Sequence, residues 1–165
     1  MKVRLKRIQN RVFGETSLQD VIKNNNREIL SSFNKDYSSF IDKIKELYDK
    51  YKEKKDAKII WEICNSINSF VDLYQKKGVK FENIYSQIRK DLGVSKYTFN
   101  HIKKFCKLYP NKKEIKYSFG LYSELMRFSS ERDRKEIEKK IELGEIPPKP
   151  KILRKISSQK KEIKN

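Results

Sequence analysis

The side chains with the clearest chemical potential lie between Ser95 and Leu108, where lysines and one asparagine recur at helical spacing. The amide of Asn100 can pair with an adenine edge through two hydrogen bonds, and lysine ammonium groups can bind phosphates or guanine. The candidate contact residues are Lys96, Tyr97, Thr98, Asn100, His101, Lys103, Lys104 and Lys107. These residue types and their spacing predict contact with nucleic acid.

The segment that must position these side chains, about residues 81–108, has the pattern of a helix-turn-helix. Ile88 and Leu92 face inward on the first helix, and Gly93 supplies the positive φ that the turn needs. The rest of the pattern consists of Val94 as an apolar plug, Ser95 as N-cap, and Phe99, Ile102, Phe105 and Cys106 on the inner face. Arg89 departs from the pattern, because alanine usually occupies this point of close helix approach.

The charge of the chain supports a polyanionic partner. Forty basic residues face 22 acidic ones, a net charge of +18, and nine basic residues but only two acidic ones lie between Arg89 and Lys116. A genome rich in A and T explains abundant lysine better than it explains this imbalance. Because a large net charge costs self-repulsion, a polyanion that neutralises it is expected. Nucleic acid is the first candidate and an anionic membrane the second.

The composition predicts an all-α fold: a multi-helix bundle with a basic extended N-terminal arm and a basic C-terminal tail. Only five glycines and four prolines interrupt the chain. We divide it into a basic arm at 1–15, a helical segment at 16–56, a core with the helix-turn-helix at 57–146, and a tail at 147–165. Pro147, Pro148 and Pro150 predict an extended start to that tail, which we expect to be mobile.

One long helix is predicted from a heptad-like seam within residues 30–51. The seam residues are Leu30, Phe33, Tyr37, Phe40, Ile44, Leu47 and Tyr51. Such a seam fits either a coiled-coil homodimer or a helix that packs on its own domain. We favour packing within the chain, because Ile29, Ile41 and Tyr48 widen the apolar stripe.

The sequence offers no constellation for catalysis or metal binding. His101 is the only histidine, and Cys64 and Cys106 are not arranged as a metal-binding pair, so no cofactor or metal is expected. We interpret both cysteines as small buried residues of a reducing cytoplasm, with a disulfide between them as the alternative. Neither a signal peptide nor an apolar run long enough to span a membrane is expected.

From Tyr48 onward the chain resembles a bacterial and archaeal family of helical domains that precede a PD-(D/E)xK nuclease. The matching stretches are Trp61-Glu62-Ile63, Lys90-Asp91-Leu92-Gly93-Val94-Ser95, Asn100, Phe105, Tyr109-Pro110 and Leu121-Tyr122-Ser123-Glu124-Leu125. The resemblance implies a DNA-binding module similar to a helix-turn-helix. It does not imply cleavage, because no Pro-Asp dipeptide precedes a Glu-x-Lys here.

Together these features predict a non-enzymatic cytoplasmic protein that binds double-stranded DNA with the second helix in the major groove. It would serve as a regulator of transcription or an accessory factor of a mobile element, plasmid, virus or defence system. Two alternatives stay open. One is a protein–protein interaction module that uses the 30–51 seam, and the other is an RNA-binding protein that stacks Tyr97 on bases.

Overall fold

A computed structural model describes residues 27–128 and 130–162, and all regular structure in these ranges is helical. The elements are α3 (Arg27–Lys54), α4 (Ala57–Lys76), α5 (Ile84–Asp91), α6 (Lys96–Leu108), the 3₁₀ helix η1 (Lys112–Glu114), α7 (Phe119–Leu125), α8 (Glu131–Glu142) and α9 (Pro150–Glu162). The predicted all-α class is confirmed for this part of the chain. The predicted basic arm at 1–15 lies outside the described residues.

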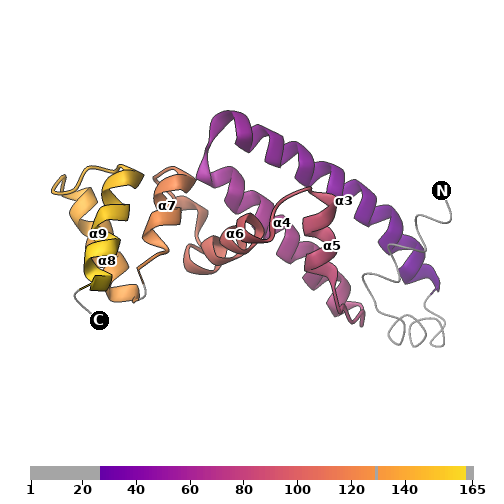
Figure 1. Cartoon of the computed structure of the whole chain (residues 1–165). Helices are drawn as coiled ribbons and strands as arrows, with labels where there is room; N and C mark the ends of the chain where they lie inside the picture. Colours follow the sequence, from indigo (N-terminus) through magenta and orange to yellow (C-terminus); the bar gives the residue numbers. More distant parts are fainter. Residues whose placement is uncertain (1–26, 129, 163–165) are drawn as a thin grey trace.

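The helices form an elongated body in which α3 lies along α4 (Figure 1). Helices α7, α8 and α9 are gathered at the end of the body that is farthest from the start of α3. The core is one cluster of buried side chains that extends from Phe33 to Leu153. It therefore includes residues on both sides of the boundaries predicted near 56 and 146. Helix α4 is central to this core, because α3 packs on one part of it and α6 on another.

The apolar seam of α3 is covered by the same chain. Phe33 and Ile44 are fully buried, and Tyr37 is only 3% exposed. The rings of Phe40 and Phe70 stack with their centroids 4.3 Å apart, which joins α3 to α4. The interpretation of the seam as a helix packing on its own domain is confirmed at these positions. A coiled-coil partner would therefore have to displace α4.

The C-terminal segment differs from its prediction. Residues 150–162 form a helix, α9, whose Leu153 is fully buried and whose Ser157 is 5% exposed. The expectation of a mobile tail is therefore wrong for this segment. Pro150 is the first helical residue, a position where the missing N–H and the fixed φ of proline are tolerated well. Helix α9 packs on α7.

The two cysteines lie at the contact between α4 and α6, and both are free thiols. Cys64 is 2% exposed, and the Cys106 sulfur lies 4.0 Å from the carbonyl oxygen of Ile60. A hydrogen bond to Cys64, together with burial, raises the pKa of the Cys106 thiol. The interpretation as a small buried residue is confirmed for Cys64, whereas Cys106 is only partly buried against the core.

Three tyrosine hydroxyls tie the helices together through carboxylates. Tyr37 donates to Asp91 at 2.7 Å, which links α3 to α5, and Tyr109 donates to Glu138 at 2.5 Å. Tyr74 of α4 donates to Asp36 of α3 at 2.6 Å. Burial, reinforced by these carboxylates, raises the pKa of all three phenols, and that of Tyr74 reaches about 12.

These tyrosines predict a loss of stability in alkali. Their folded-state pKa values lie above the unfolded value of about 10, so their contribution is complete below that pH. It is lost as the pH rises from about 10 through the folded values, because unfolding then releases protons. Urea unfolding followed by circular dichroism at several pH values should show this decline. Tyr74→Phe should flatten it, whereas Tyr97→Phe, at an exposed position, should leave it unchanged.

Candidate nucleic-acid interface

The connection between α5 and α6 is a sharp turn defined by backbone hydrogen bonds. Gly93 has a φ of +67°, in the left-handed region that glycine occupies without strain. The Gly93 N–H donates to the carbonyl of Lys90 at 3.1 Å, and the Val94 N–H donates to that of Arg89 at 3.2 Å. This pair of bonds is the Schellman arrangement of a helix C-terminus. Val94 is 6% exposed and packs into the core, as the sequence predicted.

Arg89 is accommodated because its side chain turns back over this connection. Its Nη1 donates to the carbonyl oxygen of Val94 at 3.2 Å, and the residue is only partly buried. The guanidinium therefore bridges the turn, and this position accommodates a side chain longer than that of alanine. The departure from the usual pattern thus adds a hydrogen bond across the turn.

The left-handed conformation makes Gly93 sensitive to substitution. A Cβ at this position would meet nothing within 4 Å, so the cost of Gly93→Ala comes from backbone strain alone. We expect Gly93→Ala to lower the free energy of unfolding by about 1–2 kcal/mol. Gly120→Ala is the matched control, since Gly120 lies in α7 and its Cβ would make an ordinary contact 3.8 Å from Pro150 Cγ. Urea unfolding should show a loss only for Gly93→Ala, and equal effects would contradict the strained turn.

Helix α6 starts at a side-chain cap and buries one face. Ser95 Oγ accepts a hydrogen bond from the Thr98 N–H at 3.1 Å, and the two hydroxyls lie 2.9 Å apart. Thr98 was predicted to contact nucleic acid, but its hydroxyl is thus engaged in the cap. The inner face holds Phe99, Ile102 and Phe105, each no more than 3% exposed, and it packs against α4.

Four of the predicted contact residues form a line along the opposite, exposed face of α6. Lys96, Asn100, Lys103 and Lys107 are spaced by four, three and four residues, which places them on one side of a helix. All four are exposed, and α6 contains no acidic residue. The Lys103 ammonium group lies 3.8 Å from the centroid of the Tyr85 ring, so α5 supports it. We call these four residues the α6 line.

The remaining predicted contact residues lie beside the α6 line. Tyr97 is 67% exposed, and its ring centroid is 4.2 Å from that of His101. The Lys104 ammonium group donates to the carbonyl oxygen of Met126 at 2.7 Å, which ties α6 to the end of α7. Lys104 therefore has a structural contact that the sequence did not reveal.

Two arginines that the sequence analysis missed lie near this flank, held by a buried carboxylate. Glu124 of α7 is 5% exposed and accepts from Nε and Nη2 of Arg154 at 3.1 and 2.7 Å. Arg127 Nη1 lies 3.3 Å from the other carboxylate oxygen as an ion pair. Arg154 belongs to α9, so the helical packing of the C-terminal segment brings its charge here. The signal for it was the helical spacing of Ile152, Leu153 and Ile156.

Burial and the charges of Lys104 and Arg127 influence the pKa of His101. Partial burial, with the nearby charges of Lys104 and Arg127, lowers the pKa of His101. At neutral pH the imidazole is therefore neutral and offers one donor and one acceptor. It supplies hydrogen-bonding capacity and a ring surface, while the lysines and arginines supply the charge.

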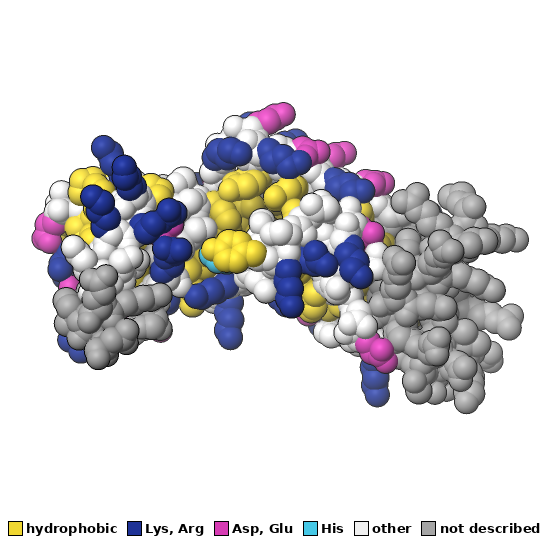
Figure 2. All heavy atoms as spheres, viewed as in Figure 1, with side chains coloured by type: hydrophobic (Ala, Val, Ile, Leu, Met, Phe, Trp, Pro, Cys, Tyr) yellow, Lys and Arg dark blue, Asp and Glu magenta, His cyan; other side chains and the backbone are white. Residues whose placement is uncertain are grey.

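Figure 2 shows one face of the molecule, on which Lys and Arg side chains lie along α3, over the middle and over the end formed by α8 and α9. The Asp and Glu side chains on this face occur mainly along the edge formed by α3. Across the described ranges, no three His, Cys, Asp or Glu side chains are grouped to hold a metal ion. No helix in those ranges has the length and apolar character to cross a bilayer.

Comparison of the chain with protein-family models, with curated protein sequences and with solved structures found no match. The resemblance to helical domains that precede a nuclease therefore stays a prediction.

Proposed function

We propose that the chain is a non-enzymatic DNA-binding protein that places α6 in the major groove of double-stranded DNA, as a helix-turn-helix does. The observation that carries this proposal is the α6 line, three lysines and one asparagine exposed on a helix without acids. The inner face of α6 packs against α4, so its outer face is free to approach a groove about 12 Å wide.

In the α6 line, the residues near the start of the helix are placed to contact base edges, and those near its end to contact the DNA backbone. In helix-turn-helix proteins, side chains near the start of the second helix contact base edges. Asn100 and Lys96 occupy that part of α6, and Asn100 can pair with adenine through two hydrogen bonds. Lys103 and Lys107 lie nearer the C-terminal end, where they can bind phosphates. Arg127 is exposed beside α6 and extends the positive surface toward α7.

The proposal includes a biological role in general terms only. As a cytoplasmic DNA-binding protein it would act as a regulator of transcription, or as an accessory factor of a mobile element, plasmid, virus or defence system. Binding as a homodimer would let two α6 helices read two half-sites one helical turn apart.

Salt dependence of binding to duplex DNA tests the proposal. Each phosphate neutralised should contribute about −0.9 to the slope of log affinity against log salt concentration. The three lysines of the α6 line therefore predict a slope of about −3. Fluorescence anisotropy of a labelled duplex measures it, with polyglutamate as a competitor of matched charge. Failure to bind duplex at low salt, or full displacement by polyglutamate, would overturn the proposal.

RNA binding is the second candidate, favoured by the exposed ring of Tyr97. An aromatic side chain that is 67% exposed offers a surface on which an unpaired base can stack. Competition between duplex DNA and a structured RNA at several salt concentrations distinguishes the two. Tighter binding of the RNA, lost in Tyr97→Ala, would favour this candidate over duplex DNA.

A further inference from the structure

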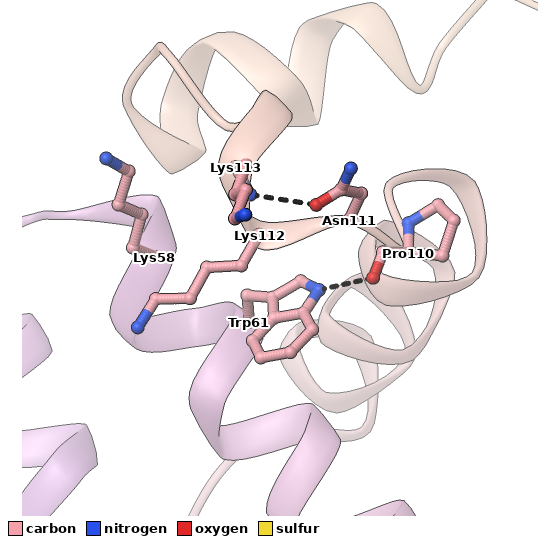
Figure 3. A pocket seen from close by; sticks show the side chains of 6 residues that line it. All are labelled: Lys58, Trp61, Pro110, Asn111, Lys112 and Lys113. Atoms are coloured by element: carbon pink, nitrogen blue, oxygen red, sulfur yellow. Dashed lines mark hydrogen bonds between the residues drawn. The ribbon is translucent and has the colours of Figure 1, made fainter.

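A hollow with a volume of about 580 Å³ lies next to the C-terminal end of α6 and belongs to none of the features used above. Its lining residues are Lys58, Trp61, Pro110, Asn111, Lys112 and Lys113. Lys58 and Trp61 come from α4, and the other four come from the segment that follows α6 (Figure 3). The hollow thus combines an aromatic ring with three lysine side chains.

The walls of the hollow are held by local hydrogen bonds. Asp56 caps α4 by accepting from the Lys58 N–H at 2.9 Å. Asn111 caps η1 by accepting from the Lys113 N–H at 3.0 Å, and its amide donates to Glu114 at 2.9 Å. These bonds fix the backbones of Lys58 and Lys113. Both side chains are exposed, so their ammonium groups stay accessible.

The indole of Trp61 is oriented with its polar atom already satisfied. Its Nε1–H donates to the carbonyl oxygen of Pro110 at 3.1 Å, which fixes the ring between α4 and the loop after α6. The residue is only partly buried, so part of the ring faces the hollow. That part has no unsatisfied donor to offer, so its contribution to binding is stacking or apolar contact.

The three ammonium groups are not equivalent. Lys112 Nζ forms an ion pair with Glu62 of α4, and Figure 3 shows its side chain extending past the Trp61 ring toward α4. Lys58 and Lys113 are exposed on the rim, and neither ammonium group has a carboxylate partner among the described residues. The rim can therefore bind an anion, while Lys112 keeps the wall in place.

We propose that this hollow binds an unpaired nucleotide, with its base stacked on Trp61 and its phosphates against Lys58 and Lys113. A nucleotide uses both features, because every base has a π-face and every linkage a negative charge. An acidic peptide would engage the ammonium groups but leave the indole without a partner. Base stacking on aromatic side chains beside a basic groove is the general mode of single-strand binding.

The position of the hollow suggests which nucleic acid reaches it. Pro110 is the second residue after Leu108, so the hollow lies just beyond the C-terminal end of α6, within reach of a strand that extends from a duplex bound there. The inference rests on the proposed function in this respect, since both place nucleic acid along α6. The preferred substrate would be a duplex with a single-stranded extension.

Trp61 is the only tryptophan in the chain, so its fluorescence reports on the hollow without a label. The probes are single-stranded oligothymidylate, the matching ribo-oligomer, an abasic oligomer of equal length, and polyglutamate. We expect the first two to quench emission and the abasic strand and polyglutamate to leave it nearly unchanged. The stronger quencher of the first two identifies DNA or RNA as the source. Equal quenching by the abasic strand or by polyglutamate, or binding of oligothymidylate without quenching, would overturn the inference.

Variants separate this site from the α6 line. Lys58→Ala with Lys113→Ala retains Trp61 and should weaken binding of oligothymidylate at least tenfold, while blunt-duplex binding stays unchanged. Lys43→Ala with Lys50→Ala, two exposed changes on α3, is the matched control and should have little effect. Quenching without blunt-duplex binding would refute the α6 proposal and keep this one. Unchanged oligothymidylate binding by the Lys58 and Lys113 variant would refute the hollow.

Discussion

The double variant Lys96→Glu and Lys107→Glu is expected to bind duplex DNA about 100-fold more weakly than the unchanged chain. Both residues are exposed at opposite ends of the α6 line, so the changes remove two attractive charges and add two repulsive ones. Helicity and the free energy of unfolding should change little, because neither side chain is in the core. Anisotropy titration measures the affinity. The slope of log affinity against log salt concentration should become less steep by about two.

Lys43→Glu with Lys50→Glu is the matched control for this prediction. Both lysines are exposed on α3, and the control lowers the net charge by the same amount. A site on α6 predicts a large loss for one pair and a small loss for the other. Equal losses would mean that net charge alone attracts DNA and that α6 has no special role. Lys103 and Lys104 are poorer test positions, since one lies over Tyr85 and the other bonds to Met126.

Phe105→Ala is expected to lower the free energy of unfolding by about 3–5 kcal/mol. Phe105 is fully buried, and its ring centroid lies 5.1 Å from that of Tyr122 and 5.4 Å from that of Phe119. These contacts join α6 to α7, so the smaller side chain would leave a cavity between the two helices. Urea unfolding followed by circular dichroism measures the loss.

Tyr97→Ala removes an aromatic ring of similar size from the same helix and serves as the control. Tyr97 is 67% exposed and contacts the His101 ring, so its removal should cost about 1 kcal/mol or less. A loss below about 1 kcal/mol for Phe105→Ala would contradict the packing of α6 on α7 described above. The two variants together separate the inner face of α6 from its outer face.

The helices with strong local signals could be predicted from the sequence. Apolar residues at helical spacing from Ile59 to Tyr74 indicate a core helix from Ala57 to about Gln75, and α4 spans Ala57–Lys76. Gly78 follows this pattern as a typical helix-ending residue, and its φ of +83° is the conformation that this role requires. Apolar periodicity and capping residues act over one or two turns of helix, so a single sequence contains them in full.

The prediction was wrong for α9, because the sequence of this segment contains conflicting signals. Pro147, Pro148 and Pro150 indicated extended chain, whereas Ile152, Leu153 and Ile156 have helical spacing. The last of these prolines, Pro150, is the first residue of α9, so the prolines restrict the connection before the helix and leave the helix intact. Burial of Leu153 and the packing of α9 on α7 stabilise the helix, and the hydrogen bond from Arg154 to Glu124 joins residues 30 apart in the chain.

The residues of the candidate site were predicted with mixed success for a similar reason. The exposed positions of α6 follow from its own periodicity, and the α6 line has the placement that was expected. The hydrogen bond from Lys104 to Met126 and the positions of Arg127 and Arg154 depend on how α6, α7 and α9 pack. The hollow at Trp61 likewise exists only because the loop after α6 returns to α4.

The turn at Gly93 has a kinetic consequence. Its two backbone hydrogen bonds and the Arg89 side chain hold α6 at one angle to α5. A partner that binds α6 as proposed would therefore meet an exposed face that is already assembled, and would pay little conformational entropy to order it. Association should then be limited by encounter, which a net charge of +18 accelerates for an anionic partner, and most strongly in dilute salt.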